Sequence, residues 1–147
     1  MTNWRGILLT AIALTVVGMV VHTIESMLTL AYYMDPTYFG VWSKLMMPAA
    51  GPPPTTFYYY SVAFALLSWG VFAFVYDKLG RAIEQKCPIR RGLKFGALVF
   101  LIAGIPGALT MYLLINLPTG LLAVWTLDQL ILYLIGGVVA AKLIGLK

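Results

Sequence analysis

Three ionisable side chains stand inside long apolar stretches of this chain: His22, Glu25 and Asp128. A charged group in the middle of a bilayer costs at least about 2.5 kcal/mol on insertion scales, so such residues usually face other helices and often mark function. Together they could bind a proton, hold a single metal ion, or hydrogen-bond the polar head of a lipid-like ligand. These three residues are therefore the candidate site.

The elements that carry these side chains are predicted to place them at one depth. A helical rise of about 1.5 Å per residue puts His22 about 25 Å from Arg5, with Glu25 one turn higher. The same rise puts Asp128 about 12 Å below the outer start of the last apolar stretch. His22 and Glu25 are three residues apart and share one helix face. We expect the three residues to converge between the first and last helices.

Several neutral polar residues at similar levels are predicted to support this cluster as hydrogen-bond partners: Thr126, Gln129, Ser61, Thr110 and Tyr112. The alternative is a structural clasp that only holds the helices in register, since such contacts average about 0.6 kcal/mol in membranes. The paired Glu-x-x-His signature of di-iron bundles is missing. We therefore expect no cofactor and no resident metal, and we assign no catalytic residue.

The composition identifies lipid as the solvent for most of the chain. Of 147 residues, 61% are hydrophobic and 10% are charged, and the mean hydropathy is +0.90. Soluble domains carry about 25% charged residues. The fold class predicted is an all-α integral membrane protein: one domain over residues 1–147, built as a four-transmembrane-helix bundle. The spans are expected at about 6–34, 56–76, 93–115 and 120–146.

The basic residues predict the orientation of these spans. Nine of the ten lie on the side shared by the two termini and the 77–94 loop, and only Lys44 lies on the other. Cytoplasmic loops are enriched in Lys and Arg, so we expect the plasma (cytoplasmic) membrane, with both termini cytoplasmic. The basic residues flank apolar segments, which argues against a nucleic-acid partner. Asp77 and Glu84 are interpreted as solvated charges of this loop, and Cys87 as a reduced thiol.

Two further features concern local structure. Apolar residues recur at helical spacing between Pro36 and Pro48, which predicts a short interfacial amphipathic helix in the first external loop. Near Pro106 the third span should kink or loosen, because proline removes a backbone hydrogen bond. Small residues at four-residue spacing predict close helix packing in the last span and in the second; they are Gly136, Gly137, Ala140 and Ala141, and Ser61, Ala65 and Ser68.

No nucleophile elbow, phosphate loop or paired zinc motif occurs, which favours a role other than catalysis. The leading hypothesis is a small accessory or interaction subunit, or a homo-oligomer, whose partners are the bilayer and another membrane protein. One alternative is a membrane enzyme or binder that uses His22, Glu25 and Asp128 to hold a lipid-like ligand. Another is a small proton-coupled transporter or channel with the same residues in its pathway.

Overall fold

The protein is described here by a computed structural model that covers residues 2–48 and 51–145. About 80% of the chain is helical, and the described residues contain no strand. Four helical segments are long and apolar enough to cross a membrane, at 25, 28, 27 and 26 residues. The predicted all-helical architecture with four such segments is therefore confirmed.

The helices follow the order expected from the apolar stretches. Their bounds are α1 Trp4–Leu28, α2 Leu30–Tyr33, α3 Thr55–Leu79, α4 Pro88–Val99, α5 Ile105–Leu114 and α6 Thr119–Ile144. Two 3₁₀ turns, η1 Pro36–Tyr38 and η2 Gly80–Ala82, lie in the loops, and a π-helical turn, η3 Phe100–Gly104, joins α4 to α5. Helices α4, η3 and α5 together make the third long segment, Pro88–Leu114.

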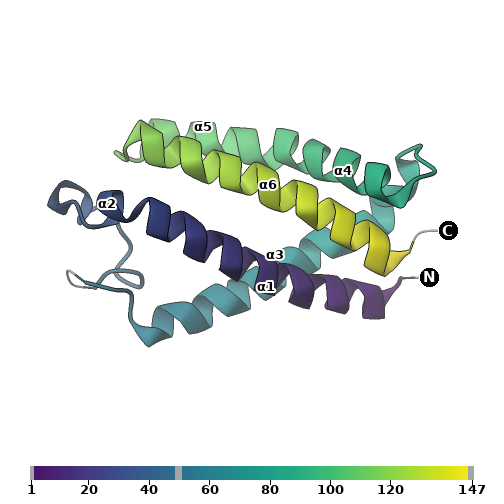
Figure 1. The fold of residues 1–147 in the computed structure, drawn as a ribbon, viewed down its shortest axis with the longest axis horizontal. Helices are drawn as coiled ribbons and strands as arrows, with labels where there is room; N and C mark the ends of the chain where they lie inside the picture. The colour runs from purple at the N-terminus through teal and green to yellow at the C-terminus, as the bar shows by residue number, and fades with distance from the viewer. Residues whose placement is uncertain (1, 49–50, 146–147) are drawn as a thin grey trace.

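The bundle has two distinct ends (Figure 1). Helix α1 begins and α6 ends at one of them, where α3 also passes into α4; we call it the terminal end. At the opposite, loop end, α1 passes into the 29–54 segment and α5 turns into α6. Figure 1 shows α6 alongside both α1 and the α4–α5 segment, while α3 runs obliquely across α1 with its beginning far from α6.

The first apolar stretch, 6–34, does not form one continuous helix. Helix α1 stops at Leu28, and the short α2 starts at Leu30. Thr29 between them has non-helical backbone angles, and its hydroxyl bonds the Glu25 carbonyl oxygen at 2.8 Å. Such back-bonding by threonine competes with the regular helix ladder and often bends it.

The first loop differs from the predicted amphipathic helix. Only Pro36–Tyr38 is helical, as a 3₁₀ turn, and residues 39–47 form successive turns and bends. The predicted helix between Pro36 and Pro48 would be marginal by itself, because isolated helices of about a dozen residues are barely stable in water. Instead, Trp42 folds back onto the bundle and stacks on Tyr33 with ring centroids 5.0 Å apart. The apolar spacing that predicted a helix here belongs to a loop in which Trp42 contacts Tyr33 and Trp125, while Leu45 stays exposed.

The third long segment departs from a regular α-helix where the sequence predicts it. The π-helical turn ends at Gly104, and α5 restarts with Pro106 in its first turn. Proline has no N–H to donate and its ring crowds the carbonyl one turn earlier, and a π turn relieves both constraints. At Gly104 the helix also needs a residue without a side chain, because a Cβ there would lie 2.4 Å from the Phe100 ring.

The closest helix contact joins α4 and α6, which are antiparallel neighbours. A Cβ added to Gly92 would lie 2.3 Å from the Gly137 carbonyl oxygen, and one added to Gly96 would lie 2.1 Å from the Tyr133 carbonyl oxygen. Glycines four residues apart allow such backbone contact. The predicted small-residue face of the last span is confirmed, because Gly136, Gly137, Ala140 and Ala141 are all buried.

The main apolar core lies toward the terminal end, among α1, α3, α4 and α6. Phe72 and Tyr76 of α3 pack edge-on against Phe95 of α4, at 5.1 and 5.0 Å between centroids. All buried residues of α3 come from Phe72 onward, and α5 has none. The second predicted small-residue face contains no buried residue: Ser61 and Ala65 are half-buried and Ser68 is exposed.

Candidate functional site

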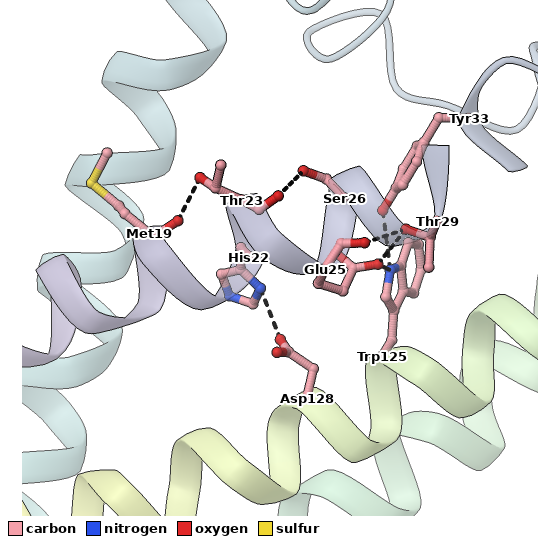
Figure 2. Close-up of polar contacts among 9 residues, drawn as sticks. All are labelled: Met19, His22, Thr23, Glu25, Ser26, Thr29, Tyr33, Trp125 and Asp128. Carbon is pink, nitrogen blue, oxygen red and sulfur yellow. Dashed lines mark hydrogen bonds and ion pairs between the residues drawn. The ribbon is translucent and has the colours of Figure 1, made fainter. Parts of the chain in front are cut away.

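Two polar side-chain contacts, which we call rungs, join α1 to α6 near the loop end. In the first, Nδ1 of His22 lies 2.8 Å from Oδ2 of Asp128. In the second, the indole N–H of Trp125 donates to Oε1 of Glu25 at 3.2 Å. Figure 2 shows both rungs reaching from α1 to α6. The rungs are three residues apart on each helix and run in opposite directions, as antiparallel helices require.

The same register continues toward the terminal end. Eight residues before His22 on α1, the buried Leu14 approaches Gly136, which lies eight residues after Asp128 on α6. A Cβ on Gly136 would lie 3.4 Å from Cδ1 of Leu14, an ordinary van der Waals contact. Apolar packing and the polar rungs therefore specify one alignment of α1 against α6.

The Asp128–His22 rung is asymmetric in exposure. The Asp128 side chain is 8% exposed, whereas that of His22 is 60% exposed. The contact uses Nδ1 of the imidazole, and Nε2 has no hydrogen-bond partner among the described residues. A carboxylate on one ring nitrogen fixes the orientation of the imidazole. Nε2 is thus presented for a proton or a polar head group.

The carboxylate of Glu25, in the second rung, is buried and accepts two hydrogen bonds. Glu25 is 8% exposed, and its Oε1 also lies 2.7 Å from the Thr29 hydroxyl. The Trp125 N–H is shared with the Tyr33 hydroxyl at 3.1 Å. Figure 2 shows Glu25, Thr29, Tyr33 and Trp125 gathered at the end of α1.

Aromatic rings lie beside this second rung. Trp42 stacks on Tyr33 at 5.0 Å, and Trp125 lies 6.3 Å from Trp42 and 6.5 Å from Tyr33. Centroid separations of 4.5–7 Å are those of rings in direct contact. The three rings are therefore in mutual contact beside Glu25, to which Trp125 donates its indole N–H.

The structure brings His22 and Asp128 into contact and places Glu25 on the neighbouring rung. The five predicted supporting residues do not join them. The hydroxyls of Thr126, Ser61 and Thr110 each donate to the carbonyl oxygen four residues earlier in their own helix, at 2.7–2.8 Å. Gln129 and Tyr112 are exposed. Among the described residues, no group of three or more His, Cys, Asp or Glu side chains is arranged to hold a metal.

The partners of Glu25 were missed by sequence reasoning. Trp125 lies three residues before Asp128, the same spacing that separates His22 from Glu25. Because α1 and α6 are antiparallel, that spacing alone predicts Trp125 opposite Glu25 once His22 is paired with Asp128.

A second polar cluster, also missed, ties three helices together at the terminal end. The side chain of Asn3 accepts from the Gly6 N–H and donates to the Ile144 carbonyl oxygen, both at 2.9 Å. The Asn3 backbone N–H donates to Asp77 at 3.2 Å, and Lys78 lies 3.1 Å from the same carboxylate. Asp77 is 8% exposed, so its interpretation as a solvated loop charge is wrong.

Comparison with known proteins finds no matching family model, no matching curated sequence and no matching solved structure. The class of protein defined by the fold is a small all-helical bundle with four helices that could span a membrane. Its function is therefore argued from the geometry of the chain itself.

Proposed function

We propose that this chain is a four-span protein of the cytoplasmic membrane that acts as an accessory or interaction subunit and docks through the outer half of α3 and through α5. One observation carries the proposal. The carboxylates of Glu25 and Asp128 are paired within the chain, while residues 55–71 and all of α5 contain no buried residue. A chain that pairs these two carboxylates internally and leaves whole helix segments exposed is suited to binding another membrane protein or a second copy.

The geometry gives less support to transport. A transport pathway needs polar groups leading to both faces of the membrane. In the described residues, the polar rungs and the Asn3 cluster are separated by the apolar core that includes Leu14 and Phe72. The two best-defined depressions of the described surface are both open and involve none of His22, Glu25 and Asp128.

Photo-crosslinking in the native membrane tests the docking role. A photoreactive residue is placed at Phe64 on the outer half of α3, which is 59% exposed, and at Leu8 on α1, which is 60% exposed. We expect a protein adduct of one defined mass from Phe64 and none from Leu8. An adduct of twice the chain mass identifies a second copy. Lipid adducts alone at both positions would contradict the proposal.

The orientation is tested at Cys87, which is exposed and lies in the segment that joins η2 to α4. A membrane-impermeant maleimide should label it in inside-out vesicles and not in right-side-out vesicles. The backbone N–H groups of Arg90 and Ile89 stabilise the thiolate and lower the pKa of Cys87. Because the thiolate is the reactive form, labelling should persist to lower pH than for an ordinary thiol. Labelling only of right-side-out vesicles would reverse the topology.

A second candidate function is favoured by the exposed imidazole. His22 is oriented by Asp128 and leaves Nε2 unpartnered among the described residues, which suits the polar head of a lipophilic ligand. Native mass spectrometry of the protein extracted from its own membrane tests this function. A retained small molecule that is lost in His22→Ala, and kept in a Thr23→Ala control, would support a binder. Retention by both variants would place any ligand elsewhere.

A further inference from the structure

An open apolar depression lies at the terminal end, between the turn after α3 and the side of α4. It is lined by Ala82, Ile83, Lys94, Ala97, Leu98 and Leu101. Lys94, Leu98 and Leu101 follow one another at four- and three-residue spacing, so they share one face of the third span. The lining is therefore a strip with a cation at one end and apolar side chains continuing along the helix.

One wall of this depression is held in place by a specific contact. The Arg91 guanidinium donates to the carbonyl oxygen of Gln85 through Nε at 3.1 Å and through a terminal nitrogen at 2.7 Å. This contact fastens the 80–87 segment to α4. Ile83, within that segment, packs against the apolar core. The depression is thus formed by the 80–87 segment, which Arg91 holds against α4, and by α4 itself.

The cation at the mouth of the depression has no protein partner. Lys94 is exposed, and the structure gives it no ion pair or hydrogen bond within residues 2–48 and 51–145. Arg91 and Lys78, in contrast, are engaged within the chain, because Arg91 bonds Gln85 and Lys78 pairs with Asp77. Arg81, Lys86 and Arg90 are exposed but do not line the depression. Lys94 lies six residues into α4, about 9 Å along the helix, and Leu101 is about 10 Å further.

We propose that this depression is a binding site for an anionic glycerophospholipid, with the phosphate at Lys94 and one acyl chain along Leu98 and Leu101. Charge complementarity and the direction of the strip argue for this occupant. A phosphate needs a cation at headgroup level, and the acyl chain needs an apolar surface that continues into the bilayer. The site rests on the membrane insertion proposed above and is independent of the docking role.

The test uses the full-length chain in bilayer nanodiscs of equimolar phosphatidylglycerol and phosphatidylcholine, with bound lipid counted by native mass spectrometry after release. Recovery in the nanodisc fraction confirms insertion before lipids are counted. Wild type should retain phosphatidylglycerol preferentially. Lys94→Gln should lower that retention about fivefold, since a basic residue near the surface contributes about that much. Lys142→Gln is the matched control, because Lys142 is exposed in the last turn of α6 and does not line the depression.

A second variant tests the apolar part of the site. Leu98→Trp should fill the strip and lower the retention of phosphatidylglycerol while Lys94 stays in place. Equal losses in Lys94→Gln and Lys142→Gln would overturn the proposal by showing general surface charge. Equal retention of both lipids by wild type would overturn it as well. Protein that fails to enter nanodiscs would instead contradict membrane insertion.

Discussion

At the terminal end of the bundle, helices meet backbone to backbone at Gly92 and Gly137, and Asn3 ties three helices together. At the loop end, α3 lies far from α6, and α1 and α6 are joined by two side-chain rungs. The terminal end has direct backbone contact between α4 and α6, whereas at the loop end α1 and the segment that follows it contact α6 through side chains, namely the two rungs and the rings of Tyr33, Trp42 and Trp125. The terminal end is therefore expected to carry most of the stability, and the loop end to be the part that can exchange partners.

The largest effect should come from Gly96→Leu. A Cβ at this position would lie 2.1 Å from the Tyr133 carbonyl oxygen, so α4 and α6 must separate. We expect a loss of about 3 kcal/mol or more, or failure to fold, since overpacking against backbone cannot relax by a rotamer change. Gly107→Leu is the control, because nothing lies within 4 Å of a Cβ there. Thermal unfolding in detergent compares the two variants, and equal losses would refute the close α4–α6 contact.

A smaller effect is expected from Asn3→Ala. This change removes the side-chain cap of α1 and the bond to the Ile144 carbonyl oxygen. A lost cap costs about 1 kcal/mol and a lost hydrogen bond a similar amount, so about 2 kcal/mol is expected. Asn116→Ala is the matched control, because Asn116 is exposed in the turn before α6. Similar unfolding temperatures for both variants would show that the Asn3 cluster does not hold the terminal end.

The four long apolar helices and the small-residue face of α6 could be predicted from the sequence, because they follow from apolar length and residue size. Their partners could not. The Gly92 and Gly96 pair sits in a basic stretch of low hydropathy, which conceals its role in packing. The helical rise per residue predicts that His22, Glu25 and Asp128 lie at one level, but depth does not determine which groups share a rung. That depends on the register of α1 against α6, which Leu14 and Gly136 help to set.

The first loop could not be predicted for a different reason. Helical spacing of Tyr38, Trp42 and Met46 is also compatible with turns that direct aromatic rings inward. The choice depends on a surface that the local sequence does not contain, namely Tyr33 and Trp125. Tertiary contacts override local propensity most easily in short segments.

The His22–Asp128 rung should contribute less than the Asn3 cluster. A double-mutant cycle of His22→Ala and Asp128→Asn is expected to give a coupling free energy of about 0.6–1.7 kcal/mol, the range measured for hydrogen bonds between membrane helices. Thr23→Ala is the control, because its hydroxyl bonds only its own helix, at the Met19 carbonyl oxygen. Zero coupling would show that the contact between His22 and Asp128 does not hold α1 to α6. A coupling larger than the Asn3→Ala loss would reverse the comparison between the two ends.

The smallest effect is expected at the second rung, where Trp125→Phe removes the N–H shared by Glu25 and Tyr33 and keeps an aromatic ring. A loss of about 0.5 kcal/mol is expected, at the low end for a hydrogen bond, because Glu25 keeps the Thr29 hydroxyl as a side-chain donor. Tyr33→Phe should cost less, since it removes one acceptor and leaves both donors on Glu25. Unfolding temperatures in detergent distinguish two arrangements of this rung. If Tyr33→Phe costs as much as Trp125→Phe, the main contact of the indole N–H is its bond to Tyr33, which joins α2 to α6, and not its bond to Glu25 of α1.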